Sequence, residues 1–457
     1  MDKVAANAAD AVADIDSGSV IGIAGFGVIH GFPVELTTAV RARELRDLTI
    51  VCNSLGRDPA HPVSIVQAGQ ASRLIAAFSA RAGGVAGAAA ALSPVPLDVE
   101  LVPQGVLVER LRAVAAGIGA FYSPVGRDTV VTGGKERREF GGQTYVLESP
   151  LHLDYALIYA RKADRAGNVS FRGTSQNFGP SFAKGARVVI VEVDELVEVG
   201  ELAPGEVDLP GIFVDRVIQR AEKAAPLWRV ARETAEARMY PGRPGRPGRT
   251  ATQLAERIAG LLPEGSYVNL GVGLPTMVSD HLDGRDVVLH AENGVLGYGT
   301  RLAQEDADPD YYNAGAEPVS LRPGAAVFDS TEAFEIARSG RLTAVVLGAF
   351  QVDGRGSFAN WTTPQMGGGA MDLLVKPGRL IIAMWHCERG GQPKIVNACQ
   401  YDVTGTECVD LIVTDLAVIE RDGRGLVLRE CAPGFEPADI ARLTEAPLVV
   451  DLWAAGR

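Results

Sequence analysis

The sequence lacks the cysteine and histidine patterns of metal sites and disulfide frameworks. It has five cysteines in 457 residues, none spaced as CxxC, and its six histidines form no metal-like pair. It has no apolar run long enough to span a bilayer, and its first 18 residues carry four aspartates without the apolar core of a signal peptide. These absences predict a protein without a metal site, in the cytoplasm and away from membranes.

Several catalytic motifs are also missing. The sequence contains no GxxxxGK[ST], HExxH or GxSxG, and residues 25–31 read GxGxxxG, one residue off the dinucleotide spacing. A P-loop, a zincin, a nucleophile elbow and a nicotinamide site are therefore disfavoured. The formal charge of −12 disfavours nucleic acid as a partner, but backbone N–H groups can still bind a small anion on an acidic protein.

A Pro-Gly-Arg repeat divides the chain near its middle. Residues 240–250 suit neither a helix nor a strand and are predicted to form an exposed linker. A charged helical run is expected at 217–239 and another at 252–262. We therefore predict an N-terminal domain over residues 1–239 and a C-terminal domain over residues 251–457.

The two halves resemble each other in three segments that follow the same order. The matching pairs are residues 17–27 with 264–273, 46–53 with 285–292, and 164–171 with 353–360. An internal duplication accounts for this order, and coincidence among glycine-rich turns is the alternative.

Short apolar runs predict strands that are buried on both faces. They lie at residues 48–52, 156–159, 188–193, 267–270, 287–290, 344–347 and 380–384. Helical runs such as residues 109–117 alternate with them. The pattern predicts an α/β fold with two similar open-sheet domains, whose sheets are mainly parallel or mixed.

Three glycine-rich segments and one glutamate are candidates for chemistry. The segments are residues 25–33, 271–275 and 366–372, the last before an expected strand at 373–375. Successive glycines let backbone N–H groups approach an anion, although any one loop alone is more simply a tight turn. Glu292 follows the predicted strand 287–290, at the edge where open α/β sheets place active sites. We expect it to be ionised and to act as a nucleophile, or else to cap a turn.

Two motifs around this glutamate are similar to the catalytic half of the family I coenzyme A transferases. They are the Glu-Asn-Gly-Val-Leu-Gly that begins at Glu292 and the Asn-Leu-Gly-Val-Gly-Leu-Pro that begins at Asn269. Further similar stretches extend from about residue 18 to about residue 448. They include residues 99–105, 109–113, 120–126, 162–169, 358–361, 368–372 and 428–434. The chain resembles the fused form of this family, whose halves are similar α/β folds.

The resemblance implies transfer of CoA by ping-pong through a glutamyl-CoA thioester on Glu292. The expected donor is a small acyl-CoA such as succinyl- or acetyl-CoA, and the acceptor is a carboxylic acid, with 3-oxoacids as candidates. CoA is the co-substrate, no permanent cofactor is expected, and the expected assembly is a homodimer. The implied oxyanion and substrate-binding residues are Asn53, Gln104, Gly271, Val272, Gly273, Asn293 and Gly294. The implied CoA-binding residues are Gly25, Phe26, Gly27, Gly31, Gly367, Gly368, Gly369 and Ala370.

The sequence departs from the family pattern around this glutamate. The departures are residues 338–343, 52–54 and 78–83, a shorter segment between Trp361 and Met366, and Trp385 in place of a usual Glu. They leave two alternatives open. In the first, water or an amine intercepts the Glu292 acyl-enzyme, as in an acyl-CoA hydrolase, because a shorter lid excludes water less well. In the second, the chain is a non-catalytic binding paralogue.

Overall fold

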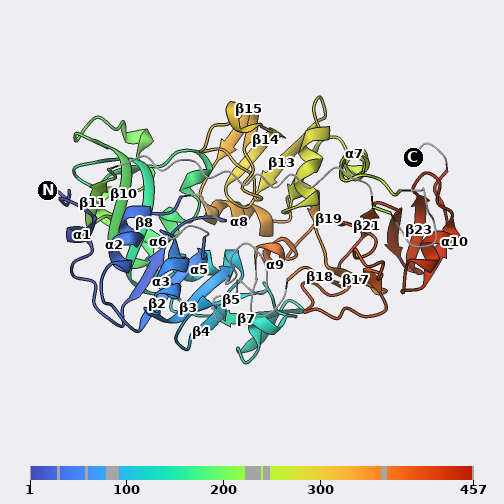
Figure 1. Cartoon of the computed structure of the whole chain (residues 1–457), viewed down its shortest axis with the longest axis horizontal. Coiled ribbons are helices and arrows are strands. Elements are labelled where there is room, and N and C mark those ends of the chain that lie inside the picture. The colour runs from blue at the N-terminus through green and yellow to red at the C-terminus, as the bar shows by residue number, and fades with distance from the viewer. Residues whose placement is uncertain are drawn as a thin grey trace.

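The computed structural model describes residues 2–27, 31–56, 60–78, 92–221, 238–239, 247–361 and 368–454. Figure 1 shows an elongated molecule with the N-terminal half at one end and the C-terminal half at the other. Each half is built on an open sheet with parallel central strands, so the predicted α/β fold with two sheet domains is confirmed.

The N-terminal sheet has the strand order β11-β10-β8-β1-β2-β3-β4, and β9 pairs with β8. Neighbours in this order are parallel, and only β9 is antiparallel to its partner. The strands are β1 (Val20–Ile23), β2 (Leu48–Ser54), β3 (Ala71–Phe78), β4 (Asp98–Leu101), β8 (Leu153–Asp164), β9 (Val169–Ser170), β10 (Ala186–Val197) and β11 (Arg216–Gln219). The helices of this half are α1 (Ala8–Ala11), α2 (Val34–Arg41), α3 (Pro62–Gln67), α5 (Gln104–Ala115) and α6 (Gly179–Lys184).

The C-terminal sheet has the order β15-β14-β13-β12-β16-β19-β21-β22-β23-β24. Its central strands from β13 to β21 are parallel, and antiparallel strands extend it on both sides. The strands are β12 (Ser266–Leu270), β13 (Val287–Ala291), β14 (Val295–Arg301), β15 (Val319–Val327), β16 (Ala344–Leu347), β19 (Arg379–Met384), β21 (Leu411–Thr414), β22 (Ala417–Asp422), β23 (Gly425–Cys431) and β24 (Leu448–Val450).

The helices of this half and two small sheets complete the fold. The helices are α7 (Ala251–Leu261), the 3-10 helix η6 (Leu274–His281), α8 (Ser330–Arg338), α9 (Ala370–Leu373) and α10 (Pro437–Arg442). One small sheet holds β5 (Phe121–Ser123), β6 (Arg137–Phe140) and β7 (Gln143–Glu148), and the other holds β17 (Gln351–Asp353), β18 (Phe358–Ala359) and β20 (Ile395–Val396).

All seven predicted strands are present, because buried apolar runs form the middle of both sheets. The helix expected at 109–117 is α5, which begins earlier, and the helix expected at 252–262 is α7. Two expectations are wrong. Residues 217–219 belong to β11, and residues 373–375 form the end of α9 and a turn, in which the Val375 N–H donates to the Asp372 carbonyl.

The structure describes only the C-terminal end of the predicted linker, from residue 247. Residues 222–237 of the expected helical run and residues 240–246 of the linker lie outside the described residues. In the rest of the linker Gly248 is buried, and the Arg249 N–H donates to the Asp415 carbonyl at 2.8 Å. This end of the linker is therefore packed against the C-terminal half, in contrast to the exposed segment that was expected.

The duplicated segments occupy equivalent places in the two sheets. β1 is parallel to β2 as β12 is parallel to β13. Asp164 accepts hydrogen bonds from the N–H groups two and four residues later, at 2.9 Å each, and Asp353 does the same at 2.9 Å each. The glycines in these turns, Gly167 and Gly356, have φ of +86° and +83°. Equivalent turns at equivalent places support the internal duplication.

Candidate active site

Glu292 lies at the carboxyl edge of the C-terminal sheet, directly after β13. Because β12, β13, β16 and β19 are parallel, the residues that follow them meet at the same edge. Gly271, Glu292, Gly348 and Trp385 come from these four strand ends, and all of them line one cavity of about 380 Å³. The topology thus brings the predicted nucleophile and the 271–273 glycine turn into one site.

The Glu292 carboxyl is buried, and its Oε2 has no hydrogen-bond partner among the described residues. Burial raises its pKa, and the nearby charge of Asp372 acts in the same direction. Hydrogen bonds from its own backbone and from Asn269 oppose this shift of the pKa. Backbone donors were expected to favour the ionised form, but desolvation outweighs the hydrogen bonds in this site, so the pKa of Glu292 is raised.

Three buried polar side chains near Glu292, those of Asn269, His290 and Tyr298, are neutral. Burial lowers the pKa of His290 to about 4, so this imidazole is uncharged near neutral pH. Burial also raises the pKa of Tyr298, and the charge of Glu292 adds to that shift. The Asn269 amide donates to His290 Nδ1 at 3.0 Å. The site can thus stabilise the carboxylate by dipoles but holds no counter-charge on these side chains.

A tight turn fixes Glu292 between β13 and the antiparallel β14. Gly294 has a φ of +104°, and a Cβ at this position would lie 2.0 Å from the Phe328 carbonyl oxygen. The Phe328 N–H donates to the Gly294 carbonyl at 3.0 Å, and the Asn293 side chain donates to the Tyr312 carbonyl at 2.7 Å. Asn293 and Gly294 therefore hold the loop in place, and neither is among the residues that line the cavity.

The N-terminal half contributes a buried amide pair. Gln104 Nε2 donates to Asn53 Oδ1 at 2.8 Å, and Asn53 Nδ2 and Gln104 Oε1 have no partner in the part of the chain that the structure describes. The Gln104 N–H donates to the Gly368 carbonyl at 3.1 Å. Gly368, Gly369 and Ala370 line the Glu292 cavity, so the amide pair lies against the loop that forms its wall.

Asp372 joins the two halves beside this loop. Its Oδ2 accepts a hydrogen bond from the Gly105 N–H at 2.9 Å, at the start of α5. A Cβ on Gly105 would lie 2.2 Å from Asp372 Oδ1. Arg338 Nη1 lies 3.4 Å from the same carboxylate, and its Nη2 lies 2.6 Å from Glu109 of α5. Figure 1 shows α5, α8 and α9 together where the halves meet.

Burial raises the pKa of the Asp372 carboxyl to about 6, against the opposing effect of Arg338. In the sequence this residue ends the glycine-rich segment 366–372 and the family-like stretch 368–372, but neither pattern implies a role for its side chain. In the sequence, Arg338 stands out only as the first residue of the 338–343 departure from the family pattern.

The glycine loop after β1 lies in another part of the junction. A Cβ on Gly25 would lie 2.4 Å from the Phe32 ring, and a Cβ on Gly31 would lie 2.6 Å from the side-chain nitrogen of Asn177. Phe26 packs against Phe178 and Tyr312, each at 6.3 Å between ring centroids. Gly25, Phe26, Gly27 and Gly31 are not among the residues that line the Glu292 cavity, and Gly367 lies outside the described residues.

Comparison with known proteins identifies the family. The family model for coenzyme A transferase matches residues 5–220 and 251–442.

The chain belongs to the coenzyme A transferase family.

Similar proteins agree with this assignment. Succinyl-CoA:3-ketoacid coenzyme A transferase 2B of Mus musculus, whose name marks it as mitochondrial, is 36% identical over 465 residues, which cover 96% of this chain and 88% of the mouse protein. One of the two 3-oxoadipate CoA-transferase subunits of Pseudomonas putida is 41% identical, and the match covers 49% of this chain and 96% of the bacterial one. The other kind of 3-oxoadipate CoA-transferase subunit, from Acinetobacter baylyi, is 42% identical, and the match covers 44% of this chain and 95% of the bacterial one.

This transferase is therefore an enzyme of the fused type, in which both kinds of bacterial chain are joined into one. An acyl-CoA transferase of Escherichia coli O157:H7, solved as a thioester complex with CoA, has the same fold. Its TM-score is 0.79 at 20% identity, and the match covers 99% of this chain and 95% of that one.

The transferase cavity also contains residues outside the predicted site. Aromatic side chains form much of its wall, including Phe78, Phe350 and Trp361, and Lys394 supplies a cation. Two of these residues could have been found from the sequence, because Trp361 belongs to a family-like motif and Trp385 departs from the family pattern. Lys394 could not have been found in this way, because a single lysine before a short apolar pair is common in sequences.

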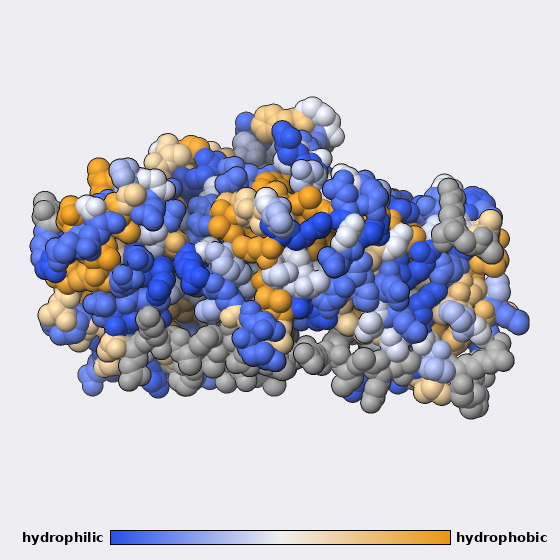
Figure 2. All heavy atoms as spheres, turned by 90° about the horizontal axis from the view of Figure 1, so that it is seen from above, coloured by the Kyte–Doolittle hydropathy of each residue, from blue (hydrophilic) through white to orange (hydrophobic). Residues whose placement is uncertain are grey.

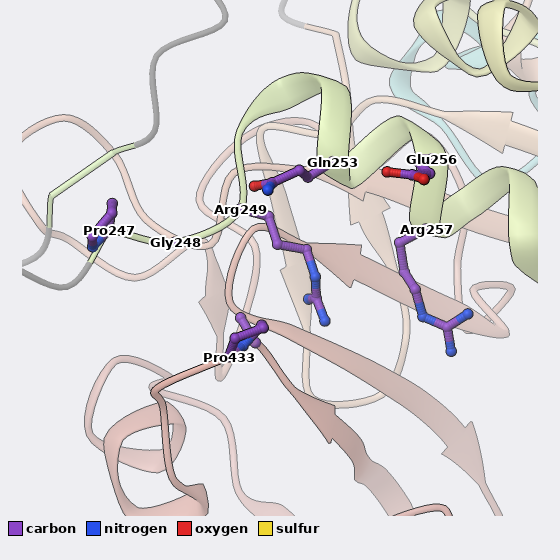
Figure 3. A pocket seen from close by; sticks show the side chains of 8 residues that line it. Pro247, Gly248, Arg249, Gln253, Glu256, Arg257 and Pro433 are labelled. Atoms are coloured by element: carbon purple, nitrogen blue, oxygen red, sulfur yellow. The ribbon is translucent and has the colours of Figure 1, made fainter. Parts of the chain in front are cut away.

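A second cavity, of about 550 Å³, lies at the start of α7 (Figure 3) and shares no lining residue with the first. Arg249 and Arg257 line it, and both pair with Glu430. It contains none of the predicted site residues. The smaller cavity is the candidate active site, because it contains Glu292.

Within the described ranges, no group of three or more His, Cys, Asp or Glu residues is placed to hold a metal ion. No helix among the same residues is long and apolar enough to cross a membrane.

Proposed function

We propose that this transferase moves CoA from a small acyl-CoA to a carboxylic acid through a glutamyl-CoA thioester on Glu292. The observation that carries the proposal is the position of this side chain. It is a buried carboxylate at the carboxyl end of β13, it lines the cavity, and its Oε2 has no partner among the described residues. A carboxylate with an unused oxygen facing a substrate cavity is suited to nucleophilic attack.

The proposed reaction uses only this carboxylate and the two substrates. A Glu292 oxygen attacks the acyl carbon, the C–S bond breaks, and an anhydride and CoA thiolate form. The thiolate attacks the glutamyl carbon and releases the donor acid as a carboxylate. The acceptor carboxylate then reverses both steps, which regenerates Glu292. No redox or metal step is required, and CoA serves as co-substrate without a permanent cofactor.

Neutral donors near the cavity support stabilisation of the oxyanions in these steps. We assign the donor role to the Asn53 amide, which Gln104 orients, and to the backbone of Gly271, Val272 and Gly273, with Asn293 and Gly294 holding the turn. Preorganised N–H groups of this kind contribute about 100- to 1000-fold each in acyl transfer. We keep the 25–31 loop and the 367–370 loop as the proposed CoA contacts.

Names of relatives support a 3-oxoacid as the acceptor. The mouse protein is named for succinyl-CoA and 3-ketoacids, and the bacterial chains are named for 3-oxoadipate. We also propose that residues 1–239 and 251–457 form the two domains, because the family match is divided at residues 220 and 251.

We further propose a homodimer in the cytoplasm. Strand β15 is at the edge of the C-terminal sheet and exposes Leu321 and Val327. Figure 2 shows a hydrophobic area near the middle of the face seen from above. An exposed strand edge of this kind favours association. The five cysteines are free, as is usual in a reducing compartment. Light scattering of the purified chain tests the dimer, and cell fractionation tests the location.

Initial-rate kinetics test the proposed transfer. Donors and acceptors that use one site in turn give parallel double-reciprocal lines, whereas intersecting lines would indicate a ternary complex and overturn the covalent route. Thiol release from acyl-CoA without an acceptor acid, at the rate of transfer, would identify a hydrolase.

A further inference from the structure

Helix α5 reaches the junction of the halves without a cap of its own. Pro103 precedes it and offers no side-chain acceptor, and the first turn of the helix contains no acidic residue. The first N–H groups of a helix need acceptors from outside it, and the helix dipole stabilises a negative charge there. The C-terminal half supplies both, because Asp372 Oδ2 accepts a hydrogen bond from the Gly105 N–H at 2.9 Å.

This contact leaves α5 little freedom to move. Asp372 is fully buried, and a Cβ on Gly105 would lie 2.2 Å from its Oδ1, so glycine is needed for the carboxylate to come this close. Four residues later on the same face of the helix, Glu109 lies 2.6 Å from Arg338 Nη2. Arg338 Nη1 lies 3.4 Å from Asp372 Oδ1. The C-terminal half therefore holds α5 at two points that are one turn apart, which fixes both its position and its rotation.

Gln104, the residue next to the Gly105 contact, belongs to the proposed site. Its Nε2 donates to Asn53 Oδ1 at 2.8 Å, and both side chains are buried. Its N–H donates at 3.1 Å to the carbonyl of Gly368, which lines the cavity of the candidate active site. A shift of α5 relative to Asp372 would therefore move the amide pair relative to the cavity.

We propose that Asp372 is a positioning residue for the transfer reaction. By capping α5 from the opposite half, it holds Gln104, and through Gln104 the Asn53 amide, where an oxyanion forms on the acyl group. This inference rests on the proposed function. Asp372 is not among the described residues that line the cavity, so its effect on the reaction passes through Gln104. Loss of the cap should slow the chemical step, since displacements of about 1 Å can cost on the order of 100-fold in rate.

A carboxylate that only fastens the junction would resemble Asp310. Its Oδ1 accepts a hydrogen bond from the Ser175 hydroxyl at 2.9 Å, and its Oδ2 accepts one from Arg172 Nη1 at 3.0 Å. These bonds join the two halves without involving Gln104 or Asn53. Asp310→Ala is therefore the matched control for the loss of a carboxylate between the halves.

The test is a double-mutant cycle between Asp372 and Gln104. The variants are Asp372→Ala, Gln104→Ala, the protein with both changes, and the Asp310→Ala control. Asp372→Asn is added in case Asp372→Ala does not fold, because asparagine keeps an oxygen for the α5 cap but turns its amide NH2 group toward Arg338. Succinyl-CoA is the donor and 3-oxoadipate the acceptor in the transfer assay. The rate of CoA adduct formation is measured with succinyl-CoA alone, and melting temperatures show which variants are folded.

Asp372→Ala should lower kcat by roughly 10- to 100-fold and keep KM within about threefold of the parent, because the displaced donor acts in the transition state. Asp372→Asn should lower kcat by about 3- to 10-fold, because a weaker neutral hydrogen bond replaces a charge-assisted one. In the Gln104→Ala background, Asp372→Ala should change kcat by less than about threefold, since the side chain that it positions is already absent. Asp310→Ala should keep both constants within about threefold of the parent.

Three results would overturn the inference. The first is an equal loss of kcat on Asp372→Ala with and without Gln104, which would show that the two residues act independently. The second is a change in KM alone, and the third is an unchanged kcat in folded Asp372→Ala. Failure of the proposed function is distinguishable, because the parent would then form no CoA adduct. Failure of the inference alone would leave the adduct in the parent and give Asp372→Ala the same rate of adduct formation.

Discussion

Asn53 and Glu292 occupy equivalent positions in the two halves of the molecule. Each comes at the end of the second strand of a duplicated parallel pair, β1–β2 in the N-terminal half and β12–β13 in the C-terminal half. One half carries an amide there and the other a carboxylate. Two carboxylates at such positions in one buried site would raise each other's pKa. The duplicated fold thus carries a charge in one half and a neutral hydrogen-bonding group in the other.

The connections after these strands also differ. β2 is followed by α3 and the parallel strand β3, whereas β13 turns directly into the antiparallel β14. That turn holds Gly294 against the Phe328 carbonyl. The C-terminal half therefore fixes its carboxylate through the backbone, whereas the N-terminal half fixes its amide through the Gln104 side chain.

The largest expected effect is at the charged position. Glu292→Ala should abolish transfer, because the nucleophile is lost. Glu292→Asp withdraws the carboxylate by one methylene and should cost about 100-fold or more, since displacements of about 1 Å have this effect on near-attack geometry. Transfer assays and melting temperatures of both variants check this. A Glu292→Ala protein with near-parental turnover and only lower stability would show that Glu292 caps a turn.

The amide position should have the next largest effect. Asn53→Ala removes a proposed oxyanion donor and should lower kcat by about 100- to 1000-fold, with a smaller change in KM. The exposed Asn397→Ala is the control for loss of an amide. If Asn53→Ala raised KM without lowering kcat, the amide would serve only in substrate binding. That result would contradict its proposed role as an oxyanion donor.

At the junction of the halves, Asp372 should make stability depend on pH. Its pKa of about 6 in the folded protein exceeds the unfolded value of about 3.9. Its contribution to the free energy of unfolding is therefore fully present below about pH 4 and is lost as pH rises through 6, by about 3 kcal/mol.

In Asp372→Asn the free energy of unfolding should change with pH by about 3 kcal/mol less than in the parent. Denaturant titrations between pH 4 and 7 measure this difference, with the exposed Asp98→Asn as the control for the lost charge. Equal pH dependence in the parent and Asp372→Asn would contradict this account of the junction.

The smallest effect should come from the equivalent turns. Gly167→Ala and Gly356→Ala place a side chain at φ of +86° and +83° and should each cost roughly 1–2 kcal/mol without changing turnover. Gly356→Ala should cost more, because its Cβ would lie 2.4 Å from Arg421 Cδ, against 3.0 Å from Lys3 Cδ for Gly167. If Gly356→Ala lost no more stability than Gly167→Ala, this account of the two turns would be contradicted.

Sequence patterns locate the strands and Glu292 because both depend on local features. A buried strand needs a short apolar run, and the edge of a parallel sheet lies where that run ends. The contact between Gly105 and Asp372 joins residues 267 positions apart, and no local pattern encodes it. The apolar residues 373–375 look like a strand in the sequence because such a short run does not separate a strand from a buried helix end.

The measurement that tests the central claim most directly is the mass of the peptide that contains Glu292 after incubation with an acyl-CoA and no acceptor acid. The account predicts a CoA adduct on that peptide, which borohydride reduces and hydroxylamine cleaves, and none in Glu292→Ala. A peptide without the adduct, across several donors that the enzyme turns over, would contradict the account.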